Sequence, residues 1–363
     1  MSKNILMPVR TVADWGGVHE WALTAVQDFV AAGIRVTVVG KEGLFQERIQ
    51  AAGGHYHVVD WEHWDAYVDQ IVASESWDLI FSHGPLARNL GIAVGESLEI
   101  PIHHMIHGAY LDHVNDWAPR VTSIIAASPS VQDFVVRVGK VEPWKVSVVA
   151  NGVPDVVFDL KYQTLAEKLR EGRGTVVTAA RLSPDKVGQI DPTIRLVTDL
   201  ANLFPDVQWT LDVMGDGPLR HEFQDRFQHG LNKIPNVDIK FSGWVSPDEV
   251  PVRMNSAVAA CVAGMGGVRA LAAGTLTLGV GAQGSVGIQT GQNLRAGIWS
   301  NFGDHGCPRF DPTDQTSDLE LIIDQGKYDE LVQFARNSCR INRSESTVRE
   351  SMFDALGIVP EYS

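Results

Sequence analysis

The stretch TVVTAARLSPDKVGQIDPTIRLVTDLANLFPDVQWTLDVMGDG, residues 175–217, decides the fold of this chain. It begins with a short apolar run at 175–181, continues through a segment of helical length at 190–204 and ends with a second apolar run at 209–217. Short apolar runs rich in β-branched residues are typical of parallel strands that helices cover on both faces. We therefore predict a strand, a crossover helix and a second, parallel strand.

The same alternation extends over most of the 363 residues. Short apolar runs are separated by segments long enough for a helix, so we expect α/β structure with right-handed crossovers and doubly wound sheets. The further expected strands are 5–9, 35–40, 56–60, 78–84, 100–108, 123–128, 146–152, 237–243, 257–263 and 275–282. The further expected helices are 18–32, 131–139, 218–232 and 247–255, with a charged helical segment after about residue 311.

A chain of this length corresponds to about two domains of roughly 100–200 residues each. The strand and helix pattern starts again after a polar stretch from Pro154 to Gly174, which we interpret as a linker. We expect an N-terminal Rossmann-like domain at 1–155, a C-terminal one at 172–335 and a ligand cleft between them. The C-terminal helices, about 336–363, are expected to pack back on the first domain.

Composition narrows the class of protein. Lys and Arg number 30 against 44 Asp and Glu, and the net charge of −14 disfavours nucleic acid as the main partner. No run of about 18 apolar residues occurs, and the first ten residues lack the pattern of a secretory signal. Three distant cysteines, Cys261, Cys307 and Cys339, match neither a disulfide framework nor a zinc site. We expect a cytoplasmic protein without a membrane-spanning helix.

Two cations follow the strand at 175–181. Arg181 closes the strand and Lys186 comes five residues later, so both are expected at the carboxyl edge of a parallel sheet, where α/β proteins bind ligands. A guanidinium can bind two phosphate oxygens while an ammonium adds a point charge. The pair is either a diphosphate clamp or two solvated surface charges.

Two glycine-rich turns follow other strands of the second half. Gly264, Met265, Gly266 and Gly267 precede a helix that contains Arg269, and such a turn can cradle a phosphate with its free N–H groups. Gly215, Asp216 and Gly217 end the strand at 209–217. These glycines allow a tight turn beneath a ligand, and Asp216 could simply stabilise that turn.

The first half offers its own candidates. Gly16 and Gly17 follow the first strand and precede a helix, which makes them either an anion site or a plain turn. The dinucleotide fingerprint with three spaced glycines is absent there. His103, His104 and His107 lie in and after the strand at 100–108. We expect His103 and His104 to be core or surface residues, His107 to be functional, and no metal to be bound.

With these residues described, the chain resembles a retaining glycosyltransferase of the GT-B fold, in the large family of glycogen-synthase-like and mannosyltransferase-like enzymes. The Gly16-Gly17 turn resembles the family's N-terminal glycine loop, and IHHMIHGAY resembles its strand ending in a His. The segment ending in Asn151, Gly152 and Val153 resembles another family element. AARLSPDKVG, VMGDGPLRHEF, FSGWVSPDEVPVRMNSA and RALAAGTLTLGVGAQGSVGIQTGQN resemble four more, in the family's order.

The resemblance implies two Rossmann-like domains, the first holding the acceptor and the second a nucleotide-diphosphate sugar. Arg181 and Lys186 would neutralise the leaving diphosphate, and the N–H groups of Gly266 and Gly267 would contact it. His107 would lie near the transferred sugar. Donor-binding roles would also fall to the other glycine-turn residues named above and to Arg269. Fixed cations and N–H dipoles would stabilise the charge that develops, without a metal or other cofactor.

The donor loop departs from the family pattern. The family usually has two Glu residues seven apart around this loop, where the present chain has Ala263 or a neighbour and Arg269. An Arg accepts no hydrogen bond, so it cannot bind ribose hydroxyls as a Glu does. The departure indicates an altered donor, an active enzyme with a rearranged pocket, or a degenerate enzyme. We carry three hypotheses for the function: a glycosyltransferase for cell-surface polysaccharide or glycoconjugate, a non-catalytic protein of the same fold that binds a glycan or partner subunit, and a sugar-nucleotide epimerase. A peripheral membrane or protein partner is compatible with the first.

Overall fold

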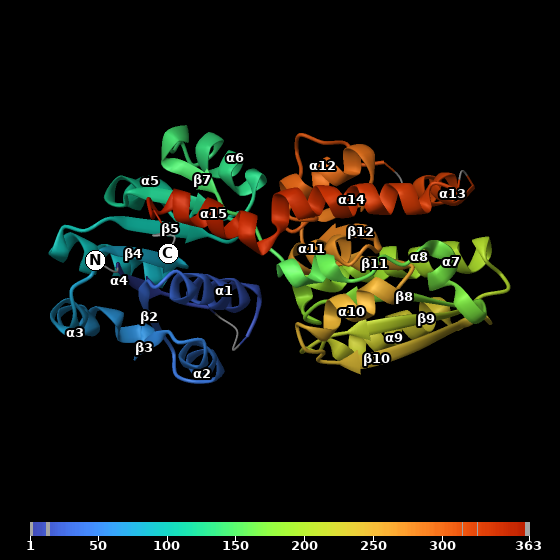
Figure 1. Ribbon diagram of the computed structural model, residues 1–363, viewed down its shortest axis with the longest axis horizontal. Helices are drawn as coiled ribbons and strands as arrows, with labels where there is room; N and C mark the ends of the chain where they lie inside the picture. Colours follow the sequence, from blue (N-terminus) through green and yellow to red (C-terminus); the bar gives the residue numbers. More distant parts are fainter. Residues whose placement is uncertain (1–2, 12–14, 314, 325, 360–363) are drawn as a thin grey trace. The chain divides into compact units, whose positions relative to one another are not determined.

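The computed structural model describes residues 3–11, 15–313, 315–324 and 326–359 (Figure 1). The chain divides into two compact units. Unit 1 comprises residues 1–150 and 349–363, and unit 2 comprises residues 151–348. Each unit has its own parallel-dominated sheet with helices around it, which confirms the predicted α/β class and its two Rossmann-like sheets.

Unit 1 is built on a seven-stranded sheet in the order β3-β2-β1-β4-β5-β6-β7. Every pairing between these strands is parallel, as expected for strands joined by crossover helices. The strands are β1 (Asn4–Pro8), β2 (Arg35–Gly40), β3 (His55–Val58), β4 (Leu79–His83), β5 (Ile102–Ile106), β6 (Ser123–Ala126) and β7 (Val146–Val148). Its α-helices are α1 (Gly17–Ala31), α2 (Leu44–Ala51), α3 (Val68–Ser74), α4 (Pro85–Leu98), α5 (Val114–Trp117), α6 (Pro129–Arg137) and most of α15 (Glu345–Ala355).

Local sequence signals begin some of these helices. Pro85 and Pro129 stand at the first positions of α4 and α6, where a missing N–H costs nothing. Ser128 caps α6, because its side chain accepts a hydrogen bond from the Val131 N–H. Each signal starts a helix directly after a strand, α4 after β4 and α6 after β6.

Unit 2 has a six-stranded sheet in the order β10-β9-β8-β11-β12-β13. The strands are β8 (Arg173–Ala179), β9 (Gln208–Met214), β10 (Val237–Gly243), β11 (Ala259–Val262), β12 (Leu276–Gly281) and β13 (Gly284–Ile288). Its α-helices are α7 (Leu165–Lys168), α8 (Ile190–Leu203), α9 (Arg220–Leu231), α10 (Glu249–Ser256), α11 (Gly264–Ala272), α12 (Gly291–Ser300), α13 (Gln315–Asp324) and α14 (Tyr328–Arg343). The edge strand β13 is antiparallel to β12, since the short turn between them forms a hairpin. The sequence did not predict β13, because its glycine-rich stretch contains no apolar run.

Two segments differ from the expected organisation. Residues expected to form a linker belong to unit 2, where Val157 and Phe158 are buried in its core and the Lys168 side chain is almost wholly buried. The helix α14, part of which was expected on the first domain, packs against α11 in unit 2. The apolar face of α14 is buried in unit 2, because Ala335 and Cys339 lie in the same core cluster as residues of α11. The division falls within α15, after Val348.

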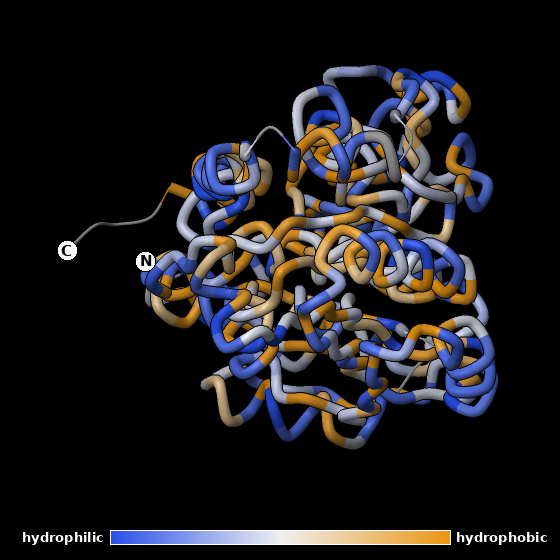
Figure 2. The backbone as a smooth tube through the Cα atoms, turned by 90° about the vertical axis from the view of Figure 1, so that its right-hand side faces the viewer, coloured by the Kyte–Doolittle hydropathy of each residue, from blue (hydrophilic) through white to orange (hydrophobic). Residues whose placement is uncertain are grey.

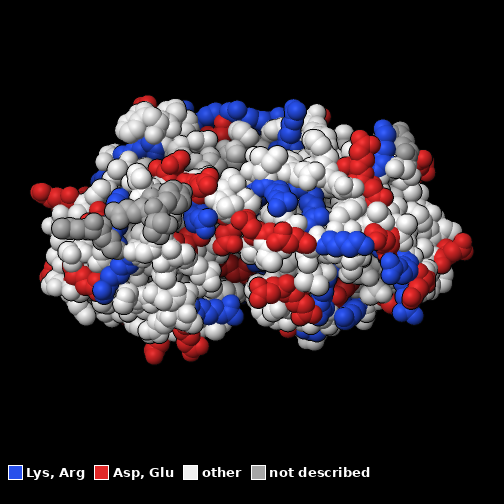
Figure 3. Space-filling view, in the orientation of Figure 1, with Lys and Arg blue, Asp and Glu red and all other residues white. Residues whose placement is uncertain are grey.

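Hydrophobic and hydrophilic segments alternate along the backbone in Figure 2. No helix within the described ranges is long and apolar enough to cross a bilayer. Basic and acidic side chains are interspersed on the face in Figure 3. That face therefore lacks the continuous basic surface that a nucleic-acid backbone requires.

Candidate functional site

The carboxyl ends of the strands in unit 2 carry most of the predicted site residues. Lys186 lies in the 3-10 helix η6 (Pro184–Gln189), which follows β8. Its Nζ donates a hydrogen bond to Oδ1 of Asp304 over 2.6 Å and lies 3.4 Å from Oδ2 of Asp185. The Lys186 and Asp304 side chains are only 17% and 20% exposed, so solvent screens their attraction incompletely. The predicted cation thus already holds an anion.

The first turn of α11 lies against the same carboxylate. Gly264 begins the helix with a φ of +54°, and a Cβ there would lie 2.7 Å from Oδ2 of Asp304. Both the backbone conformation and the close carboxylate therefore require glycine. An anion beside a helix N-terminus is electrostatically favoured. One carboxylate thus joins the predicted cation to the predicted glycine loop.

Gly266 and Gly267 of the 264–267 loop allow close packing inside unit 2, whether or not a ligand binds there. A Cβ on Gly266 would lie 3.2 Å from the carbonyl oxygen of Ala179, so α11 begins directly against the end of β8. A Cβ on Gly267 would lie 2.4 Å from the Phe302 ring, which fills the space instead. The Gly267 N–H, predicted to contact the diphosphate, instead donates to the Ala263 carbonyl at 3.2 Å, because it closes the first hydrogen bond of the helix. The N–H groups of Met265 and Gly266 belong to the first turn, whose donors have no acceptor within the helix.

The two predicted arginines occupy different settings. Arg181 follows β8 and is exposed, and its guanidinium has no hydrogen-bond or ion-pair partner among the residues that the structure describes, whereas its carbonyl accepts from the Ser183 hydroxyl at 3.2 Å. Arg269 lies in the second turn of α11 and is half-buried. The structure therefore joins Lys186 to the start of α11, and it places Arg181 in the same loop without showing a contact to either.

The turn at 215–217 holds two loops together. A Cβ on Gly215 would lie 1.9 Å from the Ala180 carbonyl oxygen, and one on Gly217 would lie 2.4 Å from that of Leu182. Asp216 accepts hydrogen bonds from the N–H of Gly217 and from the side chain of Arg220, at 2.7 and 2.8 Å. The geometry of the turn is therefore sufficient to explain why both glycines and Asp216 are present. A contact between this turn and the sugar-nucleotide donor stays a prediction.

In unit 1, His107 follows the carboxyl end of β5 and contacts a second histidine. His107 Nε2 lies 2.9 Å from Nδ1 of His83, the last residue of β4. His83 is fully buried, and burial holds the pKa of its imidazole well below the usual value. The ring of Trp21, from α1, lies 5.3 Å from the His83 ring and 5.8 Å from the His107 ring. A neutral histidine and a tryptophan thus fix the orientation of His107.

The other two histidines of this strand lie in the core. His104 is fully buried, contacts Ser82 through Nδ1 at 3.0 Å and packs edge-on against Trp117. His103 contacts the hydroxyl of Ser123 at 2.8 Å, and burial lowers its pKa to about 4. Both therefore serve packing in the neutral form, as the sequence predicted for core histidines.

Gly16 and Gly17 precede and begin α1. A Cβ on either glycine would meet nothing within 4 Å, so packing does not demand glycine there. Gly16 has extended backbone that any residue adopts. The open space is compatible with the predicted ligand role, which stays a prediction, and Asp14 of the same motif lies outside the described residues.

Sequence reasoning missed Asp304 and His83. Asp304 lies in an irregular loop after α12, and no spacing links it to Lys186, 118 residues earlier. His83 carries the signal that identified His107, a polar residue at the carboxyl end of a buried strand, and could have been found by it.

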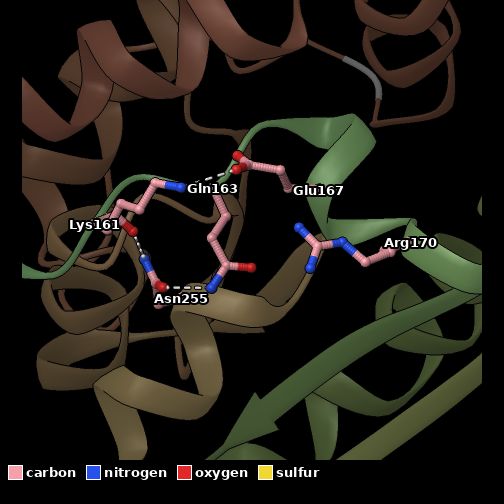
Figure 4. Close-up of a pocket in the computed structure, with 5 residues that line it drawn as sticks. All are labelled: Lys161, Gln163, Glu167, Arg170 and Asn255. Carbon is pink, nitrogen blue, oxygen red and sulfur yellow. Dashed lines mark hydrogen bonds and ion pairs between the residues drawn. The ribbon is translucent and has the colours of Figure 1, made fainter.

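A separate hollow of about 310 Å³ lies in unit 2 (Figure 4). It is lined by Lys161, Gln163, Glu167, Arg170 and Asn255. These residues precede β8 and β11, so the hollow lies at the amino ends of the parallel strands, away from Lys186. Lys161 pairs with Glu167 and Gln163 donates to Asn255, so much of its polar lining is already engaged.

Within the described parts of the chain, no group of three or more His, Cys, Asp or Glu side chains could hold a metal ion.

Comparison with known proteins identifies the fold. No family model and no curated protein matches the sequence. Among solved structures, Anabaena Alr3699/HepE in complex with UDP has a TM-score of 0.72 at 15% identity, over 98% of this chain and 100% of that one. A glycosyltransferase from Rickettsia africae has a TM-score of 0.72 at 12% identity, over 98% and 99%.

A third match has another activity. The UDP-GlcNAc 2-epimerase from Neisseria meningitidis, bound to UDP-GlcNAc, has a TM-score of 0.53 at 12% identity, over 97% of this chain and 99% of that one. Identities this low establish the fold alone. The described chain therefore has the two-sheet α/β architecture of the GT-B fold, which its resemblance to GT-B glycosyltransferases predicted.

Proposed function

We propose that the chain is a glycosyltransferase whose unit 2 binds a nucleotide-diphosphate sugar. The observation that carries the proposal is the meeting of Lys186 and the first turn of α11 at one carboxylate. A place where an ammonium lies close to the start of a helix suits an anion, and here it lies at the carboxyl edge of a parallel sheet. The neighbours solved with UDP and with UDP-GlcNAc support a nucleotide sugar as the substrate.

The chemistry that these residues could perform is stabilisation of a leaving group. Sugar transfer builds up negative charge on the departing diphosphate and positive charge on the sugar. Lys186 and the N–H groups of Met265 and Gly266 would act on that charge as fixed dipoles and a fixed cation. Arg181, exposed and unpaired among the described residues, would add a second cation that can bind two oxygens. The proposed transfer proceeds with retention and without a bound metal.

We assign the acceptor side of the reaction to unit 1. His107 is held by His83 and Trp21, so its ring could offer a fixed hydrogen-bonding atom to a sugar hydroxyl. The proposed context is synthesis of a cell-surface polysaccharide or another glycoconjugate in the cytoplasm. A membrane or partner protein that presents the acceptor is compatible with that role.

A second candidate is a non-catalytic protein of the same fold that binds a glycan or partner subunit. Its support is the donor loop, which has Ala263 and Arg269 where the resembling family has glutamates. An epimerase is a third candidate, since a UDP-GlcNAc 2-epimerase is among the structural neighbours. Proton NMR together with mass spectrometry of UDP-sugars incubated with the purified protein separates the three. An epimerase converts the donor into an isomer of equal mass, which NMR distinguishes, a transferase adds the sugar to an acceptor and so raises the acceptor mass, and a non-catalytic protein leaves the donor intact.

Isothermal titration with UDP, GDP and their sugars tests the donor site. Arg181→Ala combined with Lys186→Ala should weaken nucleotide binding, because a lost charged hydrogen bond costs about 1.5–3 kcal/mol. Lys161→Ala is the matched control, since Lys161 is an exposed lysine at the other edge of the same sheet. Equal affinity of the double variant and the wild type would refute the clamp.

A further inference from the structure

A carboxylate stands where the proposed diphosphate should bind. Oδ1 of Asp304 accepts hydrogen bonds from Lys186 Nζ at 2.6 Å and from the Ala282 N–H at 3.2 Å. Oδ2 faces the start of α11 at Gly264. The carboxylate is therefore paired with the predicted cation and lies beside the first residue of α11, whose own N–H donates to the Asn301 carbonyl at 3.1 Å.

The backbone around Asp304 is packed too tightly for the residue to move far. A Cβ on Gly281 would lie 2.2 Å from the Asp304 nitrogen, so β12 directly abuts this loop. The Gln283 N–H donates to the Gly303 carbonyl at 2.9 Å, and the Gly303 N–H donates to the Ser300 hydroxyl at 3.0 Å. Side-chain rotation is possible, but the charge stays within a few ångströms of Lys186.

We propose that Asp304 is a specificity-determining residue that makes the donor site favour a nucleotide-diphosphate sugar over the free nucleoside diphosphate. The proposal rests on the proposed function. The sugar ester has no terminal phosphate group to ionise, whereas the free diphosphate carries about one further negative charge at pH 7.5, because a phosphate monoester has a second pKa of about 6. A fixed carboxylate beside the phosphates repels the more highly charged ligand more strongly.

This arrangement would assist turnover. After transfer, the bound species changes from the ester to the free diphosphate, and its additional charge appears on the phosphate that Lys186 is proposed to hold. Repulsion by Asp304 then weakens binding of the product but affects the donor less. Asp304 contacts neither reacting atom in this proposal, and it acts through its charge and through Lys186.

The test compares two ligands on matched variants by isothermal titration at pH 7.5, with UDP and UDP-glucose as probes. In Asp304→Asn, which retains the shape of the side chain, the affinity for UDP should rise about tenfold more than that for UDP-glucose, as expected for one unit charge a few ångströms away in a partly exposed site. Asp304→Ser, which keeps a small acceptor for the Ala282 N–H, should change the ratio in the same direction. A merely structural role would change both affinities together.

Asp185→Asn is the matched control. Its carboxylate also lies near Lys186 but is 55% exposed, so solvent screening should keep its effect on the ratio below about threefold. An unchanged UDP to UDP-glucose ratio in both Asp304 variants, while the wild type binds UDP, would overturn the role of Asp304 and leave the proposed function intact. An equal shift in Asp185→Asn would also overturn it. Binding of neither UDP nor GDP by wild type and variants alike would refute both proposals.

Discussion

Acidification should destabilise unit 1 through three buried histidines, His83, His103 and His104. Burial lowers the pKa of all three, to about 4 for His103 and well below the usual value for the other two. In the unfolded chain each returns to a pKa of about 6.5. Between those values the unfolded state binds protons that the folded state does not, so stability is complete above pH 6.5 and falls as the pH decreases.

The size of the effect follows from the number of groups. At pH 5.5 each unfolded histidine is about nine-tenths protonated, while its folded counterpart stays essentially neutral, so each costs about 1.4 kcal/mol relative to pH 7.5. Three such residues together cost about 4 kcal/mol, which is a large part of a typical stability of 5–15 kcal/mol. Carboxylates contribute little over this interval, because their loss of stabilisation begins only as the pH falls toward their unfolded pKa values of about 4.

Urea unfolding followed by tryptophan fluorescence between pH 7.5 and 5.5 measures this loss. His103→Asn removes one of the three groups and keeps a polar contact for Ser123, so its stability should fall by about 1.4 kcal/mol less over the same interval. Replacing the exposed His55, which also lies in unit 1, is the control and should leave the pH dependence of stability unchanged. A wild-type loss of less than about 1 kcal/mol would refute the reasoning.

Two further predictions concern unit 2. Lys168→Met should lower the free energy of unfolding of unit 2 by about 3–5 kcal/mol, because the buried ammonium donates to three backbone carbonyls at 2.7, 2.7 and 3.0 Å. Urea titration measures this loss. The control Lys161→Met, at an exposed lysine, should change the free energy of unfolding by less than about 0.5 kcal/mol. Gly267→Ala should destabilise by about 1–3 kcal/mol, since the new methyl group would collide with Phe302. Gly188→Ala, which meets open space, is its control, and equal melting temperatures for the two variants would contradict the packing argument.

Local pattern predicted most of the fold. The apolar run at 35–40 is β2 without any change of bounds, and the helical segment at 190–204 is α8 within one residue. Such runs are informative because a strand buried on both faces must be apolar almost throughout. The antiparallel strand β13 was not predicted, since its glycine-rich sequence has no apolar run and its pairing depends on β12.

Membership of a domain was harder to predict than the elements themselves. The helix α14 was recognised as a helix, but its apolar face alone does not specify which core buries it. The structure resolves this by packing Cys339 against the Val268 region of α11. Likewise, the polar character of residues 154–174 predicted a linker, whereas the Lys168 ammonium within this stretch is buried against carbonyls that lie far away in the sequence.

The sequence by itself determined the order of strands and helices, the two-sheet architecture and the positions where Lys186 and the glycines of 264–267 leave the sheet, because these depend on periodicity and on residues a few positions apart. Only the tertiary structure brought Asp304 to Lys186 and His83 to His107. Those pairs join residues from separate loops and strands, and their chemistry depends on distance and burial, which no local pattern encodes.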